Sequence, residues 1–266
     1  MSCIPFSEDS IKAIRNRRTL ERVFERAIIT FFDRELTQTL RAARNGRTHY
    51  TASDIFKNLL MPYLQQAAMI GAMEGLEPLI AFGIGFDGSL VNRAAIAFAR
   101  EHVGELITQI DGTTRRTVQT AVSDWLQTGG KIDELSRTLA PTFGPDRART
   151  IAITEVTNAV SGGNIASWRE VNKELDTDIV SGMRWLTAND ERVCPICAPL
   201  GGLTFGEDGA EPATIAEQRT GALVSGLDAA FVHPGGAGAA GKFSGKEYQR
   251  PPAHPRCRCG LAPVVN

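Results

Sequence analysis

The residues best suited to chemistry stand in two short cysteine-rich runs near the end of the sequence. The first run holds two cysteines three positions apart, and the second holds two cysteines two positions apart, with a histidine just before them. Two thiols at the first spacing can reach one soft metal ion from a tight turn, and the second run can complete a tetrahedral shell of nitrogen and sulfur. The candidate ligands are Cys194, Cys197, His254, Cys257 and Cys259.

A structural zinc ion is the interpretation that these spacings favour. Five candidates compete for what is usually a four-ligand site, so one of His254, Cys257 and Cys259 is expected to be spare. Two disulfides or buried free thiols are the alternatives, but the pairs are clustered and residues 1–10 lack a signal-peptide pattern. The sequence contains neither HExxH nor HxE, so a closed structural site is favoured over a catalytic one.

Three arginines flank the candidate ligands: Arg192, Arg256 and Arg258. A guanidinium binds phosphate and carboxylate groups through paired hydrogen bonds, so these side chains are candidates for contacts with DNA or with acidic groups of a partner protein. The alternative is that they offset the negative charge of metal-bound thiolates. The sequence alone leaves both interpretations open.

The composition is that of an ordinary folded protein and excludes few functions. Of 266 residues, 42% are hydrophobic and 22% charged, with a net charge of −1, so overall charge does not indicate a nucleic-acid binder. Residues 1–50 carry ten Lys/Arg against six Asp/Glu, which indicates either a solvated helix face or a contact for a polyanion or partner. The apolar run at 59–86 is interrupted by prolines and glutamates, so no membrane span is expected.

Helical periodicity dominates the first two thirds of the chain. Helices are predicted at about 10–44, from residue 51 or 53 through 67, at 90–109, at 114–127, from 132 or 133, and from Pro145 past Trp168. A loop is expected around residues 83–88, a turn at Asp111-Gly112 and a kink at Gly162-Gly163. Glu155 is interpreted as a surface or pairing residue rather than a catalytic one.

The pattern then changes to short strands, which are predicted at 183–186, 202–205 and, as an edge strand, 261–264. Trp185 is expected to pack a small core beside the cysteines. Residues 206–250 are rich in glycine and alanine, so they are predicted to be a mobile or variable loop with a solvated His233.

These elements predict an α+β fold, with an N-terminal helical array followed by a small β-rich module that a zinc knuckle holds together. The expected divisions are a helical, partner-docking arm at 1–89, a helical core at 90–180 and the zinc module at 181–266. The apolar residues of 59–86 would then be buried against the rest of the array or against a partner.

The chain resembles the phage head morphogenesis family, the minor capsid proteins similar to the F protein of phage Mu. The resemblance covers about residues 90–264. It rests on TGGKIDEL at 128–135, on RA at 147–148 leading into IAITE at 151–155, and on Trp185 followed by DERVCPIC at 190–197 and PPAHPRCRC at 251–259. One departure is Ile153, which stands where the family usually has arginine.

This resemblance implies a non-enzymatic virion component of the phage head, present in few copies and formed in the host cytoplasm during assembly. The implied partners are the portal protein, other head proteins and phage DNA, with a role in head assembly and in DNA packaging or delivery. The alternative is a zinc-stapled nuclease of HNH type, which would need a catalytic histidine around a hard cation. His254 is the only histidine in the cysteine frame, and it is better explained as a ligand or a spare.

Overall fold

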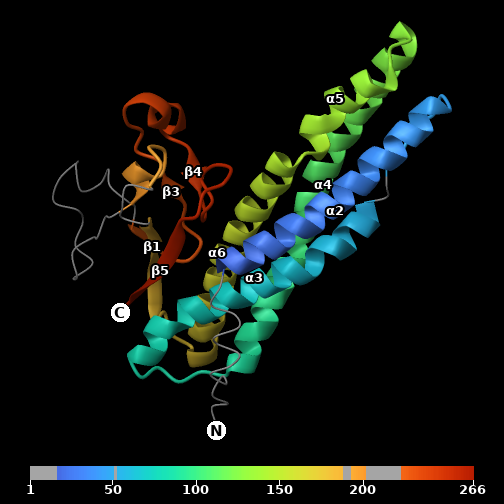
Figure 1. The fold of residues 1–266 in the computed structure, drawn as a ribbon. Helices are drawn as coiled ribbons and strands as arrows, with labels where there is room; N and C mark the ends of the chain where they lie inside the picture. The colour runs from blue at the N-terminus through green and yellow to red at the C-terminus, as the bar shows by residue number, and fades with distance from the viewer. Residues whose placement is uncertain (1–16, 51–52, 188–192, 202–222) are drawn as a thin grey trace.

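A computed structural model describes residues 17–50, 53–187, 193–201 and 223–266. Within these residues an array of α-helices precedes a small module of strands, which confirms the predicted α+β class (Figure 1). The helices are α2 (Arg17–Arg44), α3 (Ser53–Ala81), α4 (Gly88–Thr128), α5 (Ile132–Phe143) and α6 (Pro145–Leu175). Figure 1 shows the strands on one side of α6, while the ends of α2, α4 and α5 form a projection on the other side.

Helix α6 is the central element, since α2, α3, α4 and α5 all contact it. Its closest neighbour is α3, and glycines make the crossing of the two helices possible. A Cβ atom on Gly163 would lie 1.9 Å from the carbonyl oxygen of Ala68, and one on Gly71 would lie 1.8 Å from that of Val160. A kink was expected at Gly162-Gly163, but α6 is helical through this pair. The glycines have a different role, because the absence of a side chain at Gly163 allows the backbones of α3 and α6 to approach closely.

Helix α4 corrects the predicted turn at Asp111-Gly112, because one helix runs from Gly88 to Thr128 where two were expected. Its ends follow the sequence signals: the Ser89 amide donates to the Asp87 carboxylate at 2.8 Å, and Gly129 closes the helix in the left-handed region. A glycine inside a helix costs only about 1 kcal/mol relative to alanine. The burial of Val103 and Val118 on either side of Gly112 outweighs that cost.

The other helix boundaries agree with the sequence patterns in part. Pro145 lies in the first turn of α6, as predicted. Helix α5 begins at Ile132, and the Lys131 amide donates to the Glu134 carboxylate at 3.1 Å. Helix α3 continues through Ala67 to Ala81 and is followed by the loop predicted around residues 83–88, so most of the apolar run at 59–86 is helix. Among the helices that the structure describes, none combines the length and apolar character needed to cross a membrane.

The larger sheet contains β1 (Val180–Leu186), β2 (Leu223–Ser225) and β5 (Gly260–Val265) in the antiparallel order β2-β1-β5. Strand β5 is therefore an edge strand, as predicted, and its Pro263 lies opposite Met183 of β1. A second pair joins β3 (Phe231–Val232) to β4 (Glu247–Tyr248), and two 3-10 turns, η1 (Ala198–Leu200) and η2 (Gly238–Phe243), lie in the connections.

The core of this module confirms the prediction for Trp185, which is fully buried and meets Phe231 edge to face at 5.2 Å between ring centroids. Phe231 itself corrects the prediction of a mobile loop at 206–250. Residues 223–250 contain three strands and η2, and they supply this buried ring to the core. Residues 206–222 and the strand predicted at 202–205 lie outside the described residues.

His233 is also buried, with 1% of its surface exposed, where solvation was predicted. Its Nδ1 accepts a hydrogen bond from the Gly235 amide at 3.0 Å, so Nε2 carries the proton and donates to the Ile196 carbonyl at 2.8 Å. The imidazole thus fixes the glycine-rich segment to the first cysteine run, which explains why a histidine in a polar-looking loop is internal.

The hydrophobic core does not divide at residue 89. Leu60, Leu64 and Ile70 of α3 pack in one cluster with Phe24 of α2 and Val156 of α6, so the first helices share their core with α6. A second cluster joins other residues of α3, α4 and α6 to the strands. The divisions at 89 and 180 stay predictions. The described helices before residue 89 share their hydrophobic core with α6.

Candidate metal centre

The first cysteine run forms a tight turn between β1 and η1. The backbone amides of Cys197 and Ala198 both donate to the Cys194 carbonyl at 3.0 Å, and the Cys197 amide also lies 3.3 Å from the Cys194 sulfur. An amide pointing at a sulfur stabilises a thiolate there. The local backbone therefore places both thiols on one side of the turn, as the spacing predicted.

The second run forms a turn immediately before β5. The Cys257 amide donates to the His254 carbonyl at 3.1 Å, and Arg256 between them takes a left-handed conformation with φ 63°. The Cys259 amide lies 3.5 Å from the Cys257 sulfur. This turn faces the first run, so residues 60 positions apart in sequence meet at one point.

Side-chain distances bring all five predicted ligands into two overlapping groups. His254 Nε2 lies 2.9 Å from the Cys194 sulfur and 3.1 Å from that of Cys197. The sulfurs of Cys197 and Cys257 are 3.5 Å apart. Cys194, Cys197 and His254 form one group and Cys197, Cys257 and Cys259 the other, with the ligand atoms of each group within 4.8 Å of one another. Cys197 belongs to both groups.

The donor set fits a closed, tetrahedral coordination site for a metal ion. Ligand sulfurs around zinc at about 2.3 Å are separated by roughly 3.8 Å, which is close to the Cys197–Cys257 separation. Cys194, Cys197, Cys257 and Cys259 are all free thiols, and the last three are buried. These four cysteines are therefore not paired as disulfides, and the cluster can hold a metal ion.

His254 has the tautomer that metal binding requires. Its Nδ1 lies 2.8 Å from the Pro255 carbonyl, which can only accept, so Nδ1 carries the proton. Nε2 therefore presents its lone pair to the two sulfurs. This arrangement favours a ligand role for His254, although the choice of four ligands among the five stays a prediction.

The thiols share their protons unequally. Hydrogen bonds from the Cys197 and Cys259 side chains lower the pKa of Cys257, so this sulfur is the one in the cluster that most favours the thiolate form. The same hydrogen bond to Cys257 raises the pKa of Cys197, and burial adds to that effect. A cluster with a thiolate at its centre is prepared for a cation.

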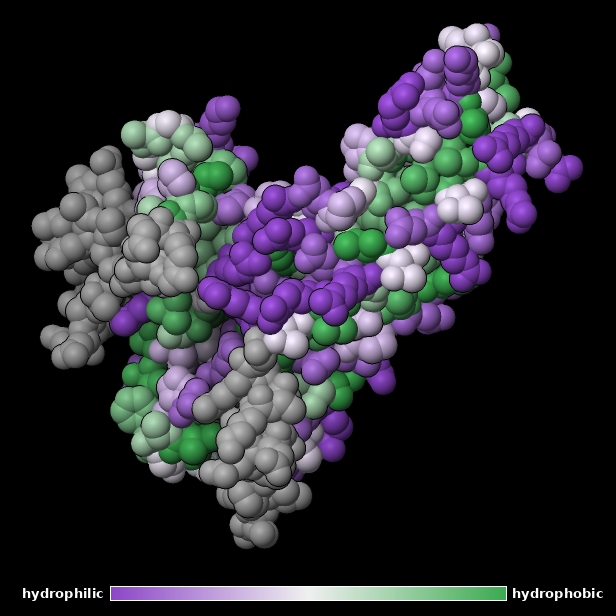
Figure 2. All heavy atoms as spheres, in the orientation of Figure 1, coloured by the Kyte–Doolittle hydropathy of each residue, from purple (hydrophilic) through white to green (hydrophobic). Residues whose placement is uncertain are grey.

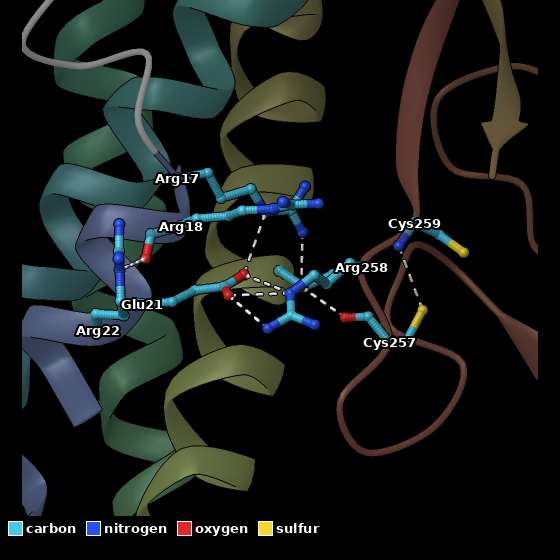
Figure 3. A network of polar contacts seen from close by, with 8 residues as sticks. Arg17, Arg18, Glu21, Arg22, Cys257, Arg258 and Cys259 are labelled. Atoms are coloured by element: carbon cyan, nitrogen blue, oxygen red, sulfur yellow. Dashed lines mark hydrogen bonds and ion pairs between the residues drawn. The ribbon is translucent and has the colours of Figure 1, made fainter. Parts of the chain in front are cut away.

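The arginines beside the ligands have partners within the chain. Arg258 donates from Nε and Nη2 to the Glu21 carboxylate at 2.9 and 2.8 Å (Figure 3). Arg256 reaches the start of α6, where it donates to Thr150 Oγ1 at 2.8 Å and to the carboxylate of Asp146 at 3.2 Å. Both guanidinium groups thus fix the second run to the helices. Arg192 lies outside the described residues, and contacts of the three with DNA or a partner stay predictions.

A further link joins α2 and α6 to the cysteine loop. Arg17 donates to Thr157 Oγ1 at 2.6 Å, and that hydroxyl donates to the Cys257 carbonyl at 2.7 Å (Figure 3). No pattern in the sequence indicated that Arg17, Glu21 or Thr157 belongs to the site. Their separations from the loop, up to 237 residues, leave no local pattern from which these contacts could be read.

Of the two roles predicted for Glu155, surface or pairing, the structure shows pairing, and the partner is His102. The Glu155 carboxylate lies 2.9 Å from His102 Nε2, a contact between residues 53 positions apart. Asn158 also contacts that nitrogen at 2.9 Å and accepts a hydrogen bond from Arg250 at 2.7 Å. This buried group connects α4, α6 and the segment before the second cysteine run.

Comparison with known proteins gives one match. A family model described as Phage Mu protein F like protein matches residues 116–262, more than half of the 266-residue chain. The match includes α5, α6, the strands and both cysteine runs. No curated protein and no solved structure matches the chain significantly.

Proposed function

The chain belongs to the family of Phage Mu protein F like proteins, and on that premise we propose that it is a minor capsid protein of a phage head. In this role it associates in few copies with the portal and assists head assembly and DNA packaging or delivery. The observation that carries the proposal is that the family match extends over both cysteine runs together with the helix on which they are fixed.

In this proposal a structural zinc ion connects the two cysteine turns of the matched region. Cys194 and Cys197 with two of His254, Cys257 and Cys259 would hold it. When bound, the ion supplies fixed tetrahedral bonds between the two turns. The chain's own contacts then carry that rigidity outward, because Arg256 and Arg258 connect the second turn to α6 and α2.

The proposal treats the chain as structural rather than catalytic. The family match gives no support to the nuclease alternative. His254, the histidine that such a nuclease would need, faces two cysteine sulfurs at 2.9 and 3.1 Å. A lone pair directed into a sulfur cluster is not available to activate a water molecule on DNA.

The docking element for other head proteins is proposed at the turn between α3 and α4. This region precedes the matched residues and exposes two apolar side chains, Ile80 in the last turn of α3 at 55% and Phe82 just after the helix at 73% exposure. Adjacent large apolar groups in water are unfavourable unless a partner covers them. A portal or neighbouring capsid protein with an apolar recess would bury this pair, which makes the turn the point of attachment.

The test is co-assembly of the full-length chain with phage heads. The double substitution Ile80→Ser and Phe82→Ser should leave a folded protein that is lost from purified heads, because the exposed side chains contribute little to the core. Leu126→Ser provides the control, since Leu126 is 45% exposed at the far end of α4 and is expected to incorporate normally. Incorporation of the double variant at the wild-type level would overturn the docking assignment, and absence of the wild-type chain from heads would overturn the function.

A further inference from the structure

Helix α2 carries an unusual number of arginines on its solvent face. The helix contains seven arginines and no lysine. All but Arg17 are exposed, and they follow one another at helical spacing from the first turn to the last. This arginine face consists of Arg18, Arg22, Arg26, Arg34, Arg41 and Arg44. Figure 2 shows the corresponding hydrophilic band along α2.

The acidic residues of α2 do not neutralise this face. Glu21 is turned inward and binds Arg258, and Glu35 is 1% exposed beside His49. Asp33 is exposed and Glu25 is half-buried. The burial of Glu21 and Glu35 separates the charges of an otherwise mixed helix, so the outward side is strongly positive.

The structure of the chain itself does not account for the first four arginines. Arg41 and Arg44 lie in the last turn, where positive charge stabilises the helix dipole. Arg18, Arg26 and Arg34 form no ion pair within the described residues. Among the residues that the structure describes, the polar contacts of Arg22 are with the Arg18 carbonyl and the Thr19 hydroxyl, both at 3.3 Å.

We propose that the arginine face of α2 binds the phosphate backbone of double-stranded DNA. The face extends from Arg18 to Arg44, roughly 39 Å at 1.5 Å per residue, which is about one turn of duplex. Exclusive use of arginine fits phosphate, because a guanidinium pairs with two phosphate oxygens where an ammonium acts as a point charge. The assignment rests on the proposed function for the source of the DNA, but the binding itself can be measured without heads.

The arginine face is less suited to a protein partner. Protein interfaces have an apolar or aromatic centre surrounded by polar groups. Val23 is the large apolar side chain exposed along α2, and the exposed pair Ile80 and Phe82 lies at the end of α3 and just after it. In Figure 3 the Arg22 side chain points away from the cysteine loop, while Glu21 faces it. The contact of Glu21 with Arg258 thus fixes α2 with Arg22 directed away from the cysteine loop.

The test measures binding of the full-length protein to a fluorescent 20-base-pair duplex by anisotropy over a series of salt concentrations. The expected result is binding whose logarithm falls linearly with the logarithm of salt. Arg22→Gln with Arg26→Gln should weaken binding at least about tenfold and reduce that slope by about 2. The matched control, Arg93→Gln with Arg100→Gln, removes two exposed arginines of α4 and should change neither value.

Two results would overturn the inference: no binding of duplex below about 200 mM salt, or equal losses in the α2 and α4 variants. Equal affinity for polyglutamate and for DNA would also overturn it, because that outcome assigns the face to an acidic protein. Incorporation into heads is scored separately with the same α2 variant. A variant that enters heads but no longer binds DNA supports the inference, while a wild-type chain that binds DNA but never enters heads refutes only the proposed function.

Discussion

Arg258, one residue after a candidate metal ligand, holds the carboxylate of Glu21 through two hydrogen bonds of 2.9 and 2.8 Å. Glu21 lies on α2 and its side chain is 5% exposed, while that of Arg258 is 43% exposed. The pair connects the cysteine loop with the first described helix over 237 residues of sequence. This ion pair therefore connects the cysteine cluster directly to the helical array.

Replacing Glu21 with glutamine tests this connection. The amide keeps the shape of the side chain but removes the charge that both hydrogen bonds use, and the partial exposure of Arg258 limits the loss. We expect the free energy of unfolding to fall by about 2 kcal/mol in urea titrations. Glu25→Gln, at a half-buried position of the same helix, should change it by less than about 0.5 kcal/mol. Equal small effects would show that the pair contributes no stability.

The crossing of α3 and α6 predicts opposite effects of alanine at two helical glycines. At Gly163 the new methyl would lie 1.9 Å from the Ala68 carbonyl oxygen, so the helices must separate and the melting temperature should fall steeply, with a loss of about 3 kcal/mol or more. A methyl group added at Gly112 would meet no packing neighbour within 4 Å, so alanine should stabilise α4 by about 0.5–1 kcal/mol. A tolerated Gly163→Ala would contradict the close crossing.

Phe231 tests whether the segment after residue 222 is part of the core. Its ring is fully buried against Trp185, so Phe231→Ala should cost about 3–5 kcal/mol, visible as a lower midpoint in denaturant unfolding followed by tryptophan fluorescence. Val232, the next residue, is 53% exposed, and Val232→Ala should cost less than about 1 kcal/mol. Similar costs at the two positions would mean that the segment is only loosely attached.

Metal content tests the cysteine cluster, and Cys197 is the decisive position because it belongs to both groups of ligand atoms. Elemental analysis should find about one zinc ion per chain in the wild type and none in Cys197→Ser. His49→Gln is the control, because His49 lies beside Glu35 at 3.9 Å and away from the cysteines.

Three further variants identify the spare ligand. Of His254→Ala, Cys257→Ser and Cys259→Ser, the one that retains a full complement of metal marks the residue that does not bind. Wild-type protein without metal, or Cys197→Ser with undiminished metal, would contradict the predicted centre.

The sequence predicted those parts of the fold that depend on local signals. The cysteine spacing, Pro145 at the start of α6 and the edge strand with Pro263 all follow from neighbours in sequence. The turn predicted at Asp111-Gly112 was wrong, because a dipeptide that often forms turns can stay helical when flanking residues such as Val103 and Val118 are buried. Burial by distant elements outweighed a local preference of about 1 kcal/mol.

The roles of single polar residues could not be predicted, since each depends on a partner far away in the chain. Glu155 meets His102 across 53 residues, and Arg256 meets Asp146 across 110. His233 looked solvated because its neighbours are glycine and proline, yet the Ile196 carbonyl lies 2.8 Å from its imidazole. Three separate packing contacts bring these groups together: α4 against α6, the second cysteine run against the start of α6, and the glycine-rich segment against the first cysteine turn.

The location of the chain in an intact phage head tests the central claim most directly. An asymmetric reconstruction of heads containing the tagged full-length chain would show where the tag lies and at what occupancy. The account predicts density at the portal vertex alone, in few copies. Density distributed over all capsid vertices and faces, or heads that lack the chain altogether, would contradict it.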